Sequence, residues 1–113
     1  MSLQDLVFVG FNSRVAALDR ESGDIVWQWQ AAKPKYGGYV TVMLDGEQLI
    51  VSVNGYMYCL DPATGEQLWY NETKGFGTGV ASIASVRGHS SGEVMAMAQQ
   101  IAQAAAAASA GSA

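Results

Sequence analysis

The feature that most constrains this chain is an 11-residue stretch that occurs twice. Residues 17–27 recur as residues 59–69, so equivalent positions lie 42 residues apart. Leu, Asp, Gly and Trp occupy the same places in both copies. A fixed period of about 40 to 50 residues is typical of β-sheet units that stack side by side, as propeller blades do. The repeat therefore predicts an all-β fold built from two copies of one unit.

Each copy predicts two strands joined by a tight turn. An apolar strand ends in an Asp, either Asp19 or Asp61, whose side chain can accept hydrogen bonds from the backbone two residues on. Gly23 and Gly65 then supply the positive φ that closes such a turn. Because the two Asp residues are equivalent by repeat, we interpret them as turn formers rather than as a catalytic carboxylate pair.

The repeated stretch resembles the tryptophan-docking motif of pyrroloquinoline quinone (PQQ)-like β-propeller repeats, and the likeness covers roughly residues 5–88. In that family the repeats form four-stranded blades, commonly eight to a ring, with each Trp packed between neighbouring blades. The blade-packing positions that the resemblance implies are Asp19, Gly23, Trp27, Asp61, Gly65 and Trp69. The second copy departs from the motif by having Cys59 in place of the usual Ala. The resemblance implies a fold rather than an activity, because this blade serves quinone dehydrogenases and non-enzymatic scaffolds alike.

The strand pattern predicts eight strands that are cut out of phase with the blades. Residues 39–44 form the inner strand of the second blade, and residues 80–86 align with them as a further inner strand. The first blade begins at its second strand and has no inner strand of its own. We therefore expect two circularly offset four-stranded blades, with residues 80–86 completing the first blade of a neighbouring copy. Residues 1–89 make this two-blade segment, and residues 90–113 are an Ala-rich C-terminal tail that predicts a helix from about Ser91 to Ala107.

Two blades cannot close on themselves, and open sheet edges favour association. Head-to-tail contacts between copies would close a ring. Four copies would give eight blades, and this is the arrangement that we favour. A ring of three copies, with six blades, is the alternative. The main expected partner is therefore the chain itself.

Composition excludes several classes of partner. The net charge is −4 and the six basic residues are scattered, so no basic patch favours nucleic acid. No run approaches the roughly 20 apolar residues of a membrane span, so no membrane partner is expected. Residues 1–5 lack the features of a signal peptide, which predicts a cytoplasmic location. The chain has a single Cys and a single His, which is too few for a typical metal site. We interpret Cys59 as a buried thiol and His89 as a loop residue.

The candidate site is the blade face where the loops leading to the inner strands meet the hairpins between the second and third strands. It would carry Lys35, Tyr36, Lys74 and Phe76, with Asn12 and Asn54 beside them. Ring symmetry would multiply the lysines, which favours an anionic small ligand or an acidic protein segment. Trp29 stays open between packing and stacking on a ligand.

We expect a non-enzymatic homo-oligomeric binding or scaffold module with no catalytic residues. The alternative is an enzyme or sensor with an axial small-molecule site. Quinone enzymes of the resembled family use a metal site and often a Cys pair, whereas this chain has one Cys and no recognisable acid–amide ligand set. Neither a quinone cofactor nor a metal is therefore expected.

Overall fold

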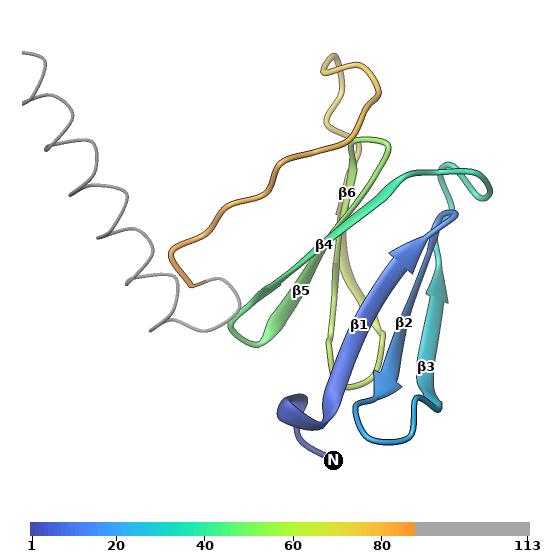
Figure 1. Cartoon of the computed structure of the whole chain (residues 1–113). Coiled ribbons are helices and arrows are strands. Elements are labelled where there is room, and N and C mark those ends of the chain that lie inside the picture. Colours follow the sequence, from blue (N-terminus) through green and yellow to red (C-terminus); the bar gives the residue numbers. More distant parts are fainter. Residues whose placement is uncertain (88–113) are drawn as a thin grey trace, which may run out of the picture.

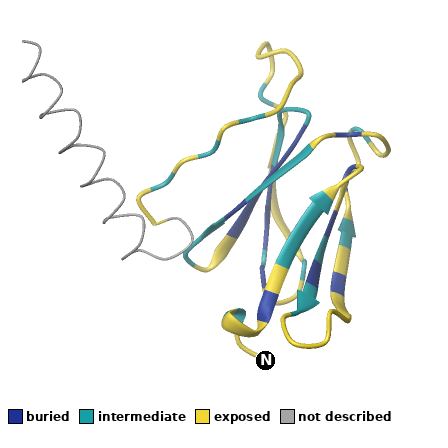
Figure 2. Cartoon of the chain, viewed as in Figure 1, coloured by how far each residue is buried: buried dark blue, intermediate teal, exposed yellow. Residues whose placement is uncertain are grey.

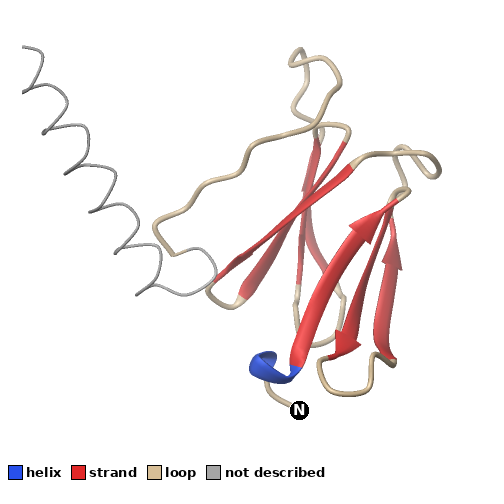
Figure 3. Cartoon of the chain, in the orientation of Figure 1, coloured by secondary structure: helices blue, strands red, loops and turns tan. Residues whose placement is uncertain are grey.

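Seven strands form two antiparallel sheets in the computed structural model, which describes residues 1–87 (Figure 1). The first sheet has the order β1-β2-β3 and the second the order β4-β5-β6-β7. A single turn of 3-10 helix, η1 (Leu3–Asp5), precedes them (Figure 3). The strands are β1 (Leu6–Phe11), β2 (Arg14–Asp19), β3 (Ile25–Gln30), β4 (Val40–Asp45), β5 (Gln48–Val53), β6 (Tyr56–Leu60) and β7 (Gln67–Asn71). The all-β prediction is confirmed, and the sheets have the form expected of propeller blades.

The two sheets repeat one another at the predicted spacing of 42 residues. Strands β1, β2 and β3 correspond to β5, β6 and β7, while β4 has no counterpart in the first sheet. Even the irregularities repeat, because the register shifts between Ala17 and Leu18 and again between Cys59 and Leu60. The first sheet therefore lacks the inner strand that the second sheet has.

The hairpins that precede β2 and β6 have the turn geometry that the sequence favours. Asn12 and Ser13 have φ of 51° and 62°, and Asn54 and Gly55 have φ of 55° and 99°. Two consecutive residues with positive φ make the type of tight turn whose twist matches that of paired strands. These two hairpin turns lie at one end of the sheets, whereas the turns after β2 and β6 lie at the other end (Figure 1).

The main core lies between the two sheets. Alternate residues of β5, namely Leu49, Val51 and Val53, are fully buried there, with Leu60 from β6 beside them. The first sheet contributes Leu6, Val15, Ala17 and Trp27 to the same cluster. A second, smaller cluster of Met43, Ile50 and Cys59 lies on the opposite face of the second sheet, with Ile83 packed against it. Figure 2 shows this burial concentrated in the facing strands of the two sheets.

The predicted eighth strand is not formed within the chain. Residues 80–85 have no strand assignment, and the segment is held to the hairpin between β4 and β5 instead. There the Gly46 N–H donates to the Arg87 carbonyl at 3.2 Å, and the Ser85 hydroxyl donates to Asp45 Oδ1 at 2.7 Å. A β-strand is defined by its pairing with a neighbouring strand, and within residues 1–87 no strand pairs with residues 80–85. The three-stranded first sheet agrees with the expectation that the first blade has no inner strand of its own. Its completion by residues 80–86 of a neighbouring copy stays a prediction.

The predicted helix within residues 90–113, and His89, lie outside the described residues. Within residues 1–87, no helix has the length and apolar character needed to cross a membrane.

Candidate functional site

Trp27 of β3 makes one of the contacts that join the two sheets. Its ring is 9% exposed, and its Nε1–H donates to the Pro62 carbonyl at 2.8 Å, in the turn after β6. The ring lies directly over Gly65, where an added Cβ would come within 2.5 Å of the indole. Gly65 is therefore needed twice, for its φ of 80° and for the space that Trp27 fills.

Asp61 and Asp19 shape the turns at this end of the molecule. Asp61 Oδ1 accepts the Ala63 N–H at 2.9 Å, and Asp19 Oδ1 accepts the Glu21 N–H at 2.8 Å. In both turns the Asp carbonyl also accepts the N–H of the glycine four residues later, at 2.7 Å and 2.8 Å respectively. Both carboxylates are thus used in turn hydrogen bonds, as the repeat indicates.

At the opposite end, the loop between β3 and β4 is fastened to both hairpins. Asn12 Oδ1 accepts the Gly37 N–H at 2.7 Å, and Asn54 Oδ1 accepts the Tyr39 N–H at 2.8 Å. Ser13, which is fully buried, accepts the Gly38 N–H at its hydroxyl at 2.7 Å. The loop that carries Lys35 and Tyr36 therefore has a fixed base rather than a free one.

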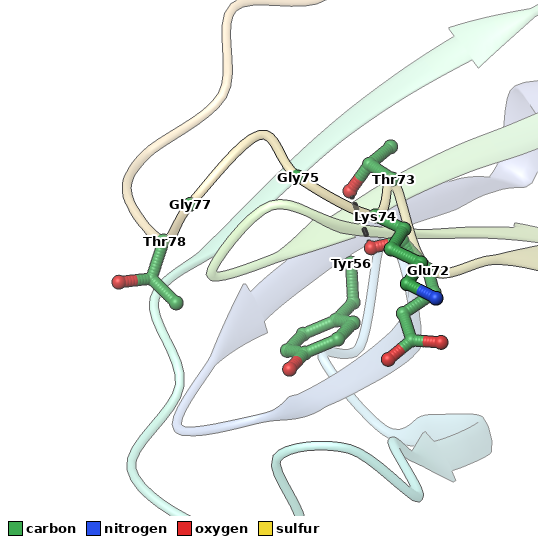
Figure 4. Close-up of a pocket in the computed structure, with 7 residues that line it drawn as sticks. All are labelled: Tyr56, Glu72, Thr73, Lys74, Gly75, Gly77 and Thr78. Atoms are coloured by element: carbon green, nitrogen blue, oxygen red, sulfur yellow. Dashed lines mark hydrogen bonds between the residues drawn. The ribbon is translucent and has the colours of Figure 1, made fainter.

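The loop that follows β7 is fastened in a corresponding way. The Thr73 hydroxyl donates to the carbonyls of Gly55 and Glu72, and the Gly79 N–H donates to the Asn54 carbonyl at 3.0 Å. The loop consequently folds back over β6 and borders an open hollow of about 230 Å³. Its lining residues are Tyr56, Glu72, Thr73, Lys74, Gly75, Gly77 and Thr78 (Figure 4). Glu72 and Lys74 lie at one end of this hollow, Thr78 lies at the other, and the Tyr56 ring lies between them.

Comparison with known protein families decides the class of this fold. A family model described as outer membrane protein assembly factor BamB, a PQQ-type β-propeller repeat, matches residues 11–110. The chain belongs to this PQQ-like propeller family. A comparison with curated proteins gives no match. The family match agrees with the two repeated sheets of the structure.

The four predicted ligand-binding residues lie on the two loops at the same end of the PQQ-like sheets, but they share no single hollow. Lys74 lines the hollow of Figure 4, while Phe76 lines a neighbouring one of about 400 Å³ together with Met57 and Val80. Lys35 lies over the ring of Tyr36, with its Nζ 5.6 Å from the ring centroid. Lys35 lines neither of these two hollows.

Tyr56, Glu72 and Thr73 line the hollow but were not predicted from the sequence. No local sequence pattern marks these residues. In the structure Thr73, two residues after β7, has a φ of 47°, an unusual value for a β-branched residue. Its hydroxyl bond to Gly55 turns the loop back toward Tyr56. A hydrogen bond across 18 residues cannot be recognised from local sequence.

Trp29 is a packing residue of the propeller core and not a free stacking platform. Its ring meets Tyr58 edge-on with centroids 4.8 Å apart, and its Nε1–H donates to Gln67 Oε1 at 3.3 Å. The Tyr58 ring also packs against the Tyr70 ring, with centroids 4.8 Å apart. The Tyr58 hydroxyl donates to the Lys33 carbonyl at 2.6 Å. The open alternative for Trp29 is thereby resolved in favour of packing between the sheets.

Tyr58 and Cys59 of β6 are buried side chains with titratable groups. Burial raises the pKa of the Cys59 thiol and of the Tyr58 hydroxyl above their ordinary values. Cys59 is fully buried, as its apolar position indicates. Among residues 1–87, no three His, Cys, Asp or Glu side chains lie close enough together to hold a metal ion.

Proposed function

We propose that this chain is a non-enzymatic binding module that assembles with copies of itself, four copies being favoured, into a closed β-propeller. Its loop end, defined as residues 31–39 and 72–79, binds an acidic protein segment or an anionic small ligand. The observation that carries the proposal is that these two loops, equivalent by repeat, are both fastened at one end of the sheets by hydrogen bonds to the hairpins. A fixed loop presents its side chains at a lower entropic cost than a free one.

Charge along the chain supports an anionic partner for the loop end. Residues 31–39 carry Lys33 and Lys35 and no acidic residue, while residues 72–79 carry one Lys and one Glu. The turns at the other end are acidic. They contain Asp19, Glu21, Asp24, Asp61 and Glu66 against the single basic residue Arg20. The chain is acidic as a whole, yet its positive charge is gathered at the end that the proposal assigns to binding.

The family description supports a protein-holding role over an enzymatic one. That description names an assembly factor, and a factor of this kind needs a surface that holds another protein. The second candidate, an enzyme or sensor with an axial small-molecule site, draws on the hollow beside Tyr56, where a carboxylate and an ammonium group lie together. An absorption spectrum of the purified protein separates the two, because a bound chromophore would favour the second.

Charge reversal at the two ends tests the binding face. A fluorescently labelled poly-glutamate peptide serves as the acidic probe, with binding followed by anisotropy at low and moderate salt. We expect the double variant Lys35→Glu with Lys74→Glu to lose binding, because it makes the loop end acidic. Arg87→Glu is the control at the opposite end, because Arg87 is exposed beside the hairpin between β4 and β5, and it should bind like the parent. Equal loss from both variants would show that net charge, and not this face, governs binding.

A further inference from the structure

The Trp27 contact has two counterparts elsewhere in the chain that lack a partner within residues 1–87. Adding 42 to Trp27 gives Trp69, and subtracting 42 from Pro62 and Gly65 gives Arg20 and Gly23. Trp69 is 43% exposed, whereas Trp27 is 9% exposed. Each half of the docking contact between the sheets is therefore present a second time on the surface.

The Gly23 turn has the shape of the occupied Gly65 turn but is open. Gly23 has a φ of 78° and Gly65 a φ of 80°, and both turns are closed by the same Asp and Gly hydrogen bonds. At Gly65 an added Cβ would strike the Trp27 ring, while at Gly23 it would meet nothing within 4 Å. The turn after β2 can therefore receive an indole ring without rearrangement.

Beside Trp69 the surface is hollowed to a volume of about 460 Å³. The lining residues are Met57, Trp69, Tyr70, Asn71 and Thr73. Ile83 packs on the inner part of this face, against Met43, Ile50 and Cys59, and leaves the outer part with Trp69 open. The exposed side is thus the one on which a docked turn would sit.

The apolar faces beside these elements also correspond. The β5 residues Leu49 and Val53 are fully buried against the first sheet, and their equivalents in β1 are Val7 and Phe11. Val7 is 39% exposed and Phe11 is 72% exposed. The first sheet therefore presents outward the face that the second sheet buries inward.

We infer that Trp69 of one copy docks on the turn between Arg20 and Gly23 of a second copy, as Trp27 docks on the turn between Pro62 and Gly65 within the chain. The Trp69 Nε1–H would donate to the Arg20 carbonyl, and the indole ring would cover Gly23. A second copy is the fitting occupant because this chain supplies both halves, and the contact that they reproduce is already formed within it. The inference rests on the self-assembly in the proposed function and names the residues that make its interface.

Two variants each remove one half of this interface. Trp69→Ser removes the ring, and Gly23→Asn fills the receiving site with a residue that tolerates positive φ. Leu68→Ser is the matched control for the first, because Leu68 is 47% exposed on the other face of β7. Gly75→Asn is the control for the second, since Gly75 has a φ of 86° and open space around it. Both controls should assemble like the parent.

Native mass spectrometry of the variants, alone and mixed, gives the decisive result. Each interface variant alone should remain at 11.9 kDa, whereas an equal mixture should give a dimer of twice that mass, because one intact half remains on each partner. Dimer formation on mixing also shows that both variants are folded. Two outcomes would overturn this interface while leaving self-assembly in place, provided that the parent assembles. In the first, either interface variant alone still assembles; in the second, the mixture of the two variants gives no dimer. A monomeric parent would overturn both.

Discussion

Trp27 and Trp69 hold the same position in two repeats of one sequence, yet one is buried and the other lies open. The difference does not arise inside the repeats, because both residues are on outer strands with equivalent pairing, Trp27 opposite Ala17 and Trp69 opposite Cys59. It arises from the neighbour of each repeat: the second repeat offers Trp27 a turn, and no described part of the chain offers one to Trp69. In stacked repeats, burial belongs to the interface between neighbours and not to the unit itself.

The two tryptophans should differ most in how much their replacement lowers the free energy of unfolding. Trp27→Ala should lower the free energy of unfolding by about 3–5 kcal/mol at every protein concentration, because a buried aromatic and its hydrogen bond are lost. Trp69→Ala should cost less than about 1 kcal/mol in dilute protein, since the ring is half-exposed there. Its cost should grow with concentration as assembly contributes to stability. Urea denaturation at two concentrations measures both, and a large, concentration-independent loss at Trp69 would contradict the comparison.

A smaller difference is expected between the two turn glycines. Gly65→Ala should cost about 2–4 kcal/mol, because an unfavourable positive φ is combined with a clash against Trp27. Gly23→Ala has the same strain without the clash, so about 1 kcal/mol is expected in dilute protein. Thermal unfolding of both variants checks this order. Equal losses would mean that Trp27 does not rest on the second turn as described.

The smallest effect is expected for the thiol of Cys59, which lies in the buried cluster on the same face of the second sheet as Trp69. Burial raises the pKa of Cys59, so alkylation by iodoacetamide near neutral pH should be slow in the folded protein and fast after unfolding. The pKa of the Cys59 thiol is higher in the folded than in the unfolded protein. Its contribution to stability is therefore fully present at pH values below the unfolded pKa, where the thiol is neutral in both states. That contribution is lost as the pH rises through the folded pKa, in the alkaline range. Stability should therefore be level around neutral pH and fall in alkali, and less steeply in Cys59→Ala.

Much of the fold could be predicted from local chemistry. The Asn-Gly hairpin forms because both of its residues tolerate a positive φ, and the Asp turns form because each Asp side chain accepts the backbone N–H two residues on. The structure confirms both. The eighth strand stays a prediction, because residues 80–86 have strand-forming composition and were expected to pair with a neighbouring copy, while within residues 1–87 they pair with no strand. Composition indicates that a segment can pair, and only the fold shows whether a partner is within reach.

The candidate site could be predicted only in outline. Repeat equivalence placed Lys35 and Lys74 on loops at one end of the sheets, where the structure has them. The hollow lined by Tyr56 and Glu72 depends on a loop folding back through the Thr73 hydroxyl, a contact set by the tertiary structure. The aromatic packing of Trp29 on Tyr58 likewise joins residues that are far apart in the sequence.

If the open Trp69 face and the open Gly23 turn are two halves of one contact, the chain should close into a ring with its copies. Native mass spectrometry of the unmodified protein at micromolar concentration measures the mass of this assembly. Four chains of 11.9 kDa predict a single species of about 48 kDa. A trimer would correct the number of blades and leave the contact in place. A single species at 11.9 kDa would contradict the account.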